Sequence, residues 1–366
     1  MADWRSGLMR GHRLPPVLAT FALGAAGGLA GWAAGLPLGV LLGAMVSVAL
    51  AATARVHLFG ALPGVPPHWR YALIPIIGVS IGGSFPADFI AQALHWWPTM
   101  LAVLAFVPLA HWASYHIYRR LGRIDPPTAF FAAMPGGFIE ALDMGEKQGA
   151  EMQMLVMLQF LRLILCIVLV PMSFSLVTGH AVGSGSGVSL PGARLPLGWH
   201  DGLILLGAGL IGYLGAQRLN FPAAVLSGPL LLSALAHASG LTQATPPAWM
   251  IVVTQWVVGT TLGTRFAGLE LRRLWLAIRL STVAIAASML IAMAIAIALS
   301  GPVKEPASAV ILAFAPGGIS EMALVAISLQ LSAVYVTLHH LVRIVLAVLV
   351  ARAGLRFLPA HEGAPR

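Results

Sequence analysis

The chain has 366 residues, of which 58% are hydrophobic and only 9% are charged. Its mean hydropathy of +0.88 exceeds what the core of a soluble protein of this length needs, so we expect the chain in a lipid bilayer. The net charge of +9 does not indicate nucleic-acid binding, because the basic residues fall between apolar blocks, as in cytoplasmic loops that face anionic lipid.

The chain begins with residues 1–13, which contain three arginines and are predicted to be a cytoplasmic N-terminal segment. The apolar block that follows has the composition of a signal peptide. The stretch up to Pro37 nevertheless matches the start of the second half of the chain, so we interpret it as a retained first helix. The apolar blocks of the first half lie at residues 14–33, 36–54, 70–87, 96–118, 128–144 and 152–178.

A Gly/Ser-rich linker at residues 179–200 separates these blocks from a second set, and residues 356–366 form a C-terminal tail. Most blocks reach the ~20 residues that a membrane-spanning helix requires. The blocks of the second half lie at residues 201–218, 221–239, 248–264, 275–300, 308–328 and 331–352.

The two halves repeat one another. The sequence MPGGFIE at residues 134–140 returns as APGGISE at residues 315–321, an offset of 181 (316 − 135). A period this long indicates a duplicated domain, so we predict a membrane repeat 1 at residues 14–178 and a membrane repeat 2 at residues 201–355. Other pairs follow the same offset or, upstream, an offset of 185: Gly78 with Gly259, Arg162 with Arg343, and Gly43 with Gly228.

The fifth block of each half is short and has Pro-Gly-Gly and a glutamate at its centre, which favours a broken or re-entrant helix. If neither fifth block crosses the bilayer, every dense Lys/Arg cluster falls on one side. If both cross, the cluster at residues 265–273 lies outside. We therefore predict an all-α polytopic membrane protein with two inverted repeats, each of about five transmembrane helices plus one broken or re-entrant segment, and with both termini cytoplasmic.

The repeated Pro-Gly-Gly turns are the first candidate site. Each turn exposes free N–H groups at a helix N-terminus, which is a natural binding site for an anion. The alternative is a helix break that only allows two segments to cross closely. The residues of the two turns are Pro135, Gly136, Gly137, Pro316, Gly317 and Gly318.

The glutamates that follow the turns, Glu140 and Glu321, are candidates for coupling transport to protons or cations. Acidic side chains inside a membrane are usually functional, and burial raises the pKa of a carboxyl group. The alternative is that they only complement the helix dipole. Asp143 shares a helix face with Glu140 but has Leu324 as its counterpart, so it adds a candidate coupling position in the first half alone.

An arginine in each sixth helix, Arg162 or Arg343, lies within apolar sequence. Gln159 and His340 stand three residues before these arginines, on the same helix face, and are expected to support them. A buried arginine needs a partner: one of the two glutamates, a helix C-terminus, or an anionic substrate. Substrate binding and a Glu–Arg clamp that holds the broken helix both remain open.

The paired Pro-Gly-Gly-x-x-Glu motifs, each with an arginine 22 residues after its glutamate (162 − 140; 343 − 321), resemble the AbrB-type family of duplicated bacterial integral membrane proteins. The resemblance covers residues 14–355. Members of that family have been labelled putative ammonia monooxygenase and regulator of gene expression, and they are unrelated to the small soluble DNA-binding protein of the same name. The resemblance implies a bacterial inner-membrane protein without an established substrate.

Three classes of function follow. The first is a secondary transporter of a small anionic or zwitterionic, carboxylate-like solute, coupled to protons or cations. The second is a membrane protein that affects gene expression indirectly, since no loop is long enough for a DNA-binding module. The third, a monooxygenase-like enzyme, is not expected: the histidines are scattered, so we predict no catalytic residue, metal site or cofactor.

The expected partners are a small solute and membrane lipid, without nucleic acid. Runs of small residues such as 24–28 allow close helix contacts within or between chains, so a homo-oligomer stays open.

Overall fold

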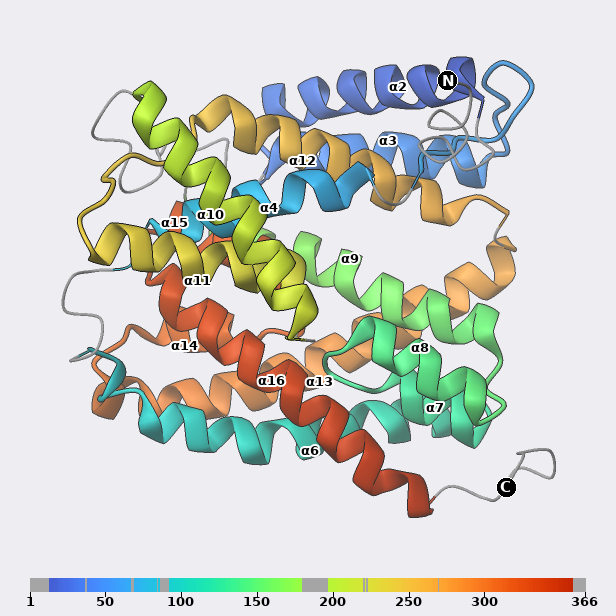
Figure 1. The fold of residues 1–366 in the computed structure, drawn as a ribbon. Helices are drawn as coiled ribbons and strands as arrows, with labels where there is room; N and C mark the ends of the chain where they lie inside the picture. The colour runs from blue at the N-terminus through green and yellow to red at the C-terminus, as the bar shows by residue number, and fades with distance from the viewer. Residues whose placement is uncertain are drawn as a thin grey trace. The chain divides into compact units, whose positions relative to one another are not determined.

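The computed structural model describes residues 13–36, 38–66, 69–83, 85, 92–179, 197–219, 221, 223–268 and 270–357. Helices make up most of this part of the chain, and it contains no β-strand (Figure 1). Most of the predicted linker, nearly all of the N-terminal segment and most of the C-terminal tail lie outside the described residues.

Several helices are long and apolar enough to cross a membrane, and their bounds agree with the apolar blocks to within four residues. This confirms the all-α polytopic membrane class, because a bilayer core requires the backbone to bond within each helix. The inverted orientation of the two halves stays a prediction. The candidate spans are α2 (Leu14–Ala33), α6 (Trp97–Arg120), α9 (Met152–Thr178), α13 (Leu271–Val303) and α16 (Ala333–Gly354).

Other helices are shorter than their apolar blocks predict. The α3 and α11 helices have 15 residues each, and at 1.5 Å per residue they measure about 22 Å, less than the ~30 Å hydrocarbon core. Both begin late, because the residues before them, Leu38 and Ala223, adopt left-handed backbone angles (φ 49° and 51°). These shorter helices are α3 (Gly39–Thr53), α4 (Trp69–Gly82), α11 (Ala224–Ala238) and α12 (Ala248–Gly263); α10 (Trp199–Arg218) has 20 residues.

The chain divides into two compact units, and each takes segments from both halves of the sequence. Unit 1 contains the first three described helices of each half, α2 to α4 and α10 to α12. Unit 2 contains the later helices of each half. Each compact unit therefore contains equivalent segments of the two predicted repeats. Unit 1 is Met1–Ala87, Pro171–Leu269 and Ile327–Gln330; unit 2 is Asp88–Val170, Glu270–Ala326 and Leu331–Arg366.

In unit 1 the two halves exchange helices. The α2 helix packs on α3, and α10 packs on α11, each within its own half (Figure 1). The α4 helix of the first half packs instead on α11 of the second, and α12 of the second half packs on α3 of the first. Such reciprocal contacts are what two copies related by a two-fold axis produce.

Glycines bring the helices of each half into backbone contact. A Cβ atom on Gly43 would lie 2.0 Å from the carbonyl oxygen of Gly27, and a Cβ atom on Gly228 would lie 2.0 Å from that of Gly212. The two pairs are equivalent at the offset of 185 (212 − 27; 228 − 43). Any side chain at these positions would overlap a neighbouring backbone, so only glycine allows this approach.

The exchanged contacts also depend on glycine. A Cβ atom on Gly78 of α4 would lie 2.5 Å from the carbonyl oxygen of Leu226, and one on Gly259 of α12 would lie 2.4 Å from that of Leu41. The glycines are 181 residues apart and the leucines 185 (259 − 78; 226 − 41). The same contact is thus made twice: α4 of the first half contacts α11 of the second, and α12 of the second half contacts α3 of the first.

Unit 2 contains a similar exchange. The α6 helix of the first half packs on α16 of the second, where Thr99 Oγ1 lies 2.9 Å from Nε2 of His339. In return, the Ser281 hydroxyl of α13 donates a hydrogen bond to the Leu158 carbonyl of α9 (3.4 Å). Each half of the sequence therefore supplies a long helix that supports the sixth helix of the other half.

Candidate functional site

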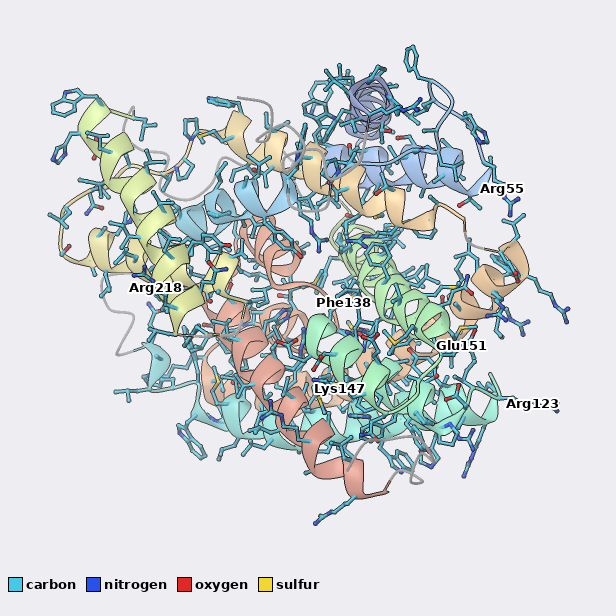
Figure 2. The ribbon with its side chains drawn as sticks, turned by 45° about the vertical axis from the view of Figure 1, so that its right-hand side comes forward. Arg55, Arg123, Phe138, Lys147, Glu151 and Arg218 are labelled. Atoms are coloured by element: carbon cyan, nitrogen blue, oxygen red, sulfur yellow. The ribbon has the colours of Figure 1, made fainter. Side chains whose placement is uncertain are left out.

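Each half has one helix that is interrupted at the predicted place. The α7 helix (Pro126–Ala132) ends before the first Pro-Gly-Gly turn, and α8 (Phe138–Lys147) begins after it. The α14 helix (Ala307–Phe314) and α15 (Ile319–Ser328) flank the second turn in the same way. Figure 2 labels the two ends of α8, Phe138 and Lys147. The structure confirms the broken fifth segments; whether they cross the bilayer stays a prediction.

Local chemistry explains the first interruption. The Asp125 carboxylate accepts a hydrogen bond from the Thr128 backbone N–H (3.0 Å) and so begins α7. Gly137, the residue before α8, has a φ of +70°, which a residue with a Cβ adopts only with strain. The second interruption closes differently, since the Gly317 N–H donates to the Ala315 carbonyl (2.8 Å).

The polar side chains of α9 bind the carbonyl end of α7. Arg162 is buried, and its Nη1 donates to the Met134 carbonyl oxygen. The buried Gln159 amide donates to the Phe131 carbonyl oxygen (2.6 Å). A cation at the negative end of a helix dipole is favourable. These contacts therefore cap the first half of the interrupted helix.

The second half repeats the arrangement with different groups. Arg343 is 2% exposed and donates from Nη1 to the Ala315 carbonyl and from Nη2 to the Gly317 carbonyl (2.8 Å). His340 Nε2 lies 3.1 Å from the Leu312 carbonyl oxygen. Each arginine lies 28 residues after the carbonyl that its Nη1 binds (162 − 134; 343 − 315).

The arginines thus find one of the three predicted partners, the helix C-terminus. Among the described contacts, no ion pair joins either arginine to a carboxylate, so these contacts contain no Glu–Arg clamp. The described ion pairs are Lys147–Asp143, Arg273–Glu151 and Arg273–Glu270.

Both interruptions meet at α16. Arg343 binds the second one, and the next residue, Ile344, packs against the first, because a Cβ atom on Gly136 would lie 3.2 Å from the Ile344 Cα. Arg162 and Arg343 lie within electrostatic range of one another. The structure therefore brings both turns and both arginines together within unit 2. The turn residues are buried apart from the half-buried Gly318.

Part of the hydrogen-bonding capacity at this site is unused. The Nε atoms of Arg162 and Arg343 are buried and make no hydrogen bond, and the same holds for Gln159 Oε1 and His340 Nδ1. An unsatisfied buried donor costs ~1–3 kcal/mol, and two buried cations close together repel one another. An anionic group that accepts from the two Nε atoms would offset both costs, so the arginine pair is a candidate anion site.

The acidic candidates are less enclosed. Glu140 lies in the first turn of α8, as predicted, but its side chain is exposed, so the expected burial is not found there. Asp143 is exposed as well, and its carboxylate lies 2.7 Å from Lys147 Nζ. The Glu321 side chain lies outside the described residues. A coupling role for these acids stays a prediction.

Sequence reasoning missed the backbone acceptors and one ion pair. The carbonyls of Met134 and Ala315 are partners of the arginines, and only the constant spacing of 28 residues in both halves could have suggested them. The missed ion pair joins Glu151 to Arg273 (Figure 2 labels Glu151). Among the described residues, no three His, Cys, Asp or Glu side chains gather to hold a metal ion.

A family sequence model described as AbrB, "Transition state regulatory protein AbrB", matches residues 40–359, which include both interrupted helices and both arginines. The chain belongs to the AbrB family. Its helices place it with the membrane-type AbrB proteins rather than with a soluble regulator. The chain is also similar to "Uncharacterized protein YhjN" of Bacillus subtilis (strain 168), with 26% identity over 304 residues that cover 78% of this chain and 77% of that protein.

Proposed function

We propose that this AbrB-family protein is a secondary transporter of the bacterial inner membrane, with cytoplasmic termini, for a small anionic or zwitterionic, carboxylate-like solute. It binds and releases the solute without chemical conversion and uses no cofactor. The observation that carries the proposal is the meeting of two interrupted helices with two buried arginines whose Nε atoms have no partner.

The chemistry of the site favours a carboxylate. A guanidinium group donates two parallel hydrogen bonds to a planar oxyanion, and each arginine already uses part of its fork to hold a backbone carbonyl. The remaining Nε–H groups suit one small anion better than a bulky ligand. The N-termini of α8 and α15 add positive helix ends, as at the substrate sites of transporters with discontinuous helices.

The division of the chain supports transport over static binding. Alternating access requires parts of a protein to move as bodies around a binding site. Each compact unit is assembled from both halves of the sequence, and the candidate anion site belongs to unit 2 alone. In this proposal unit 2 keeps its bound solute while access to the site changes.

Coupling to protons or cations would use Glu140 and Glu321, with Asp143 as an additional position in the first half. The Glu140 side chain is exposed, so solvent reaches it, as it must reach a coupling group. Glu140 lies in the first turn of α8, near the positive helix end at which the anion is proposed to bind.

Proteoliposomes test the proposal. The purified full-length protein should take up at least one member of a panel of radiolabelled mono- and dicarboxylates and amino acids under an imposed pH gradient. Arg343→Gln should abolish that uptake, and Arg343→Lys should reduce it, because lysine keeps the charge but loses the fork. The matched control is Arg218→Gln at the exposed end of α10 (labelled in Figure 2), which should leave uptake unchanged.

Size-exclusion chromatography distinguishes a transport defect from misfolding. The proposal is wrong if Arg343→Gln remains folded and transports as fast as the wild type. Uptake that persists in Glu140→Gln and Glu321→Gln without any dependence on the pH gradient would remove the coupling role but not the anion site.

The family description favours one indirect role as a second candidate. A protein that sets the concentration of a metabolite can change gene expression without binding DNA, which agrees with the word "regulatory" in that description. A deletion strain should then recover normal expression when the transported solute is supplied or removed.

A further inference from the structure

Unit 2 contains a cavity of about 430 Å³ that the proposed anion site does not use. It lies between α6, α7 and the end of α16, which continues into the short helix η3 (Leu355–Phe357). Rings from α6 and α7 form much of its wall, and one cation from η3 completes it. These residues are His111, Trp112, Tyr115, His116, Phe130 and Arg356.

The rings are packed against one another, so the cavity is a built feature of unit 2. The His111 and Phe130 ring centroids are 4.6 Å apart, and those of Trp112 and His116 are 4.5 Å apart. On the α16 side, a Cβ atom on Gly354 would lie 2.5 Å from Phe130 Cζ. A larger residue at position 354 would push the phenyl ring away from its present place.

The cavity offers polar groups to its occupant. His111 is only 4% exposed, and neither ring nitrogen makes a hydrogen bond of normal geometry, although the Phe130 backbone is a polar neighbour. Arg356 is exposed at the rim. A buried imidazole without a well-formed hydrogen bond and an exposed guanidinium suit an anionic head. The aromatic walls suit an apolar chain.

The position in the membrane identifies the source of such a ligand. The α6 and α16 helices are candidate spans, they pack together, and both have arginines in their last turns. Trp112 is 63% exposed, as expected of an aromatic side chain at the level of lipid headgroups. Basic pockets between spanning helices near a membrane surface bind anionic lipid headgroups.

We propose that this cavity binds an anionic phospholipid, with the phosphodiester against Arg356 and the imidazoles and the start of an acyl chain along the aromatic wall. The assignment is independent of the proposed transport function, because the lining of the cavity includes neither Pro-Gly-Gly turn nor either buried arginine of the anion site. It gives the protein a lipid requirement on the side where α6 and α16 end.

Native mass spectrometry of the purified full-length protein tests the assignment. After delipidation, the protein is titrated with phosphatidylglycerol or with phosphatidylcholine of the same acyl chains. The wild type should bind the first phosphatidylglycerol about fivefold more tightly than phosphatidylcholine, the preference expected from one arginine near a membrane surface. Arg356→Gln should remove this preference.

A neighbouring arginine provides the matched control. Arg352 is exposed in the last turn of α16 but does not line the cavity, so Arg352→Gln should keep the preference. Gly354→Leu, which displaces the Phe130 ring of the cavity wall without changing the charge, should weaken the binding of both lipids. Equal losses in the two arginine variants, or no loss in Gly354→Leu, would overturn the assignment.

A soluble competitor separates a lipid from a free phosphate. Glycerol phosphate at millimolar concentration should not displace the bound phosphatidylglycerol, because it lacks the chain that the aromatic wall contacts. Full displacement would identify a site for soluble phosphate esters and would overturn the lipid proposal.

Discussion

Unit 1 and unit 2 treat the sequence repeat differently. In unit 1 two equivalent contacts agree closely: a Cβ atom on Gly43 or on Gly228 would lie 2.0 Å from the carbonyl oxygen of Gly27 or Gly212, respectively. In unit 2 the two arginines, Arg162 and Arg343, occupy equivalent positions, but their hydrogen bonds differ. Arg162 donates to one described carbonyl and Arg343 donates to two.

This difference separates packing from chemistry. Only glycine fits at the Gly27–Gly43 and Gly212–Gly228 approaches, and both halves have glycine there. The interrupted helices of unit 2 need a donor at the carbonyl end, but either an amide or an imidazole provides one, as Gln159 and His340 do. The two halves therefore keep the same arginine at the candidate site but differ in the donor beside it.

The largest effect is expected from substitutions that disrupt the helix packing of unit 1. Gly43→Leu and Gly228→Leu should each prevent folding, because the new side chain overlaps the backbone of the neighbouring helix. Fluorescence-detected size-exclusion chromatography should show aggregated protein for both variants, to a similar extent. Gly207→Leu in α10 is the control, since nothing lies within 4 Å of a Cβ atom there. A monodisperse Gly43→Leu protein would contradict the close approach.

The next largest effect is expected from removal of the buried arginines, which tests the difference between the two halves of unit 2. Arg343→Ala removes the described donor to the Gly317 carbonyl, whereas after Arg162→Ala the Met134 carbonyl still accepts from the Gln159 amide (3.5 Å). At ~1–3 kcal/mol for each unsatisfied buried group, Arg343→Ala should be the less stable variant. Thermal unfolding in detergent measures the order. If Arg162→Ala unfolds at the lower temperature, the second interruption is not the more strongly held one.

An exchange of the supporting groups should have a smaller effect. In His340→Gln the amide can still donate to the Leu312 carbonyl, as Gln159 does to the Phe131 carbonyl, so we expect less than about 1.5 kcal/mol of destabilisation. His340→Leu, which has no donor, is the comparison variant and should be clearly less stable. Equal stabilities would show that the imidazole hydrogen bond contributes little.

Glu305 provides a pH-dependent test in the second half, where its counterpart in the first half is Ile124 (305 − 181). Partial burial raises the pKa of the Glu305 carboxyl above its ordinary 4.5, although a hydrogen bond from Trp96 opposes this. The folded state then holds the proton more tightly than the unfolded state, so stability falls as the pH rises from 4.5 through the raised pKa. Glu305→Gln should flatten that part of the profile of unfolding temperature against pH.

The control for this profile is the exposed Glu146, whose change to Gln should leave the slope in place. A slope that survives in Glu305→Gln assigns the pH dependence to another group.

The smallest effect concerns the acid that the second half lacks. Asp143 and Lys147 form an exposed pair, so Asp143→Asn should change stability by less than ~0.5 kcal/mol. Lys147→Gln should match it. If Asp143→Asn instead alters pH-driven uptake while Lys147→Gln does not, Asp143 belongs to the coupling groups of the first half.

Much of this structure could be predicted from the sequence, and the exceptions have physical reasons. Hydropathy located α2 and α9 to the residue, and Pro-Gly-Gly located both interruptions, because a proline followed by two glycines disfavours a continuous helix. The late starts of α3 and α11 could not be predicted, since Leu38 and Ala223 give no sign of a left-handed backbone.

Hydrogen-bond and packing partners were harder to predict than the positions of the helices. The sequence showed that Arg162 and Arg343 need a compensating group, but a backbone carbonyl has no side-chain signature, so the acceptors at Met134 and Ala315 stayed hidden. The exchange of helices between the halves was hidden for a similar reason. An apolar helix face indicates that the face is covered, but it does not indicate which helix covers it.

The exchange of α4 and α12 between the halves has a consequence for biosynthesis. When the first half leaves the ribosome, α4 has already been made but α11, the helix on which it packs, has not. The nascent protein must therefore keep the glycine face of α4 in the lipid until more than a hundred further residues have been translated, and that interval is when an insertion factor would act.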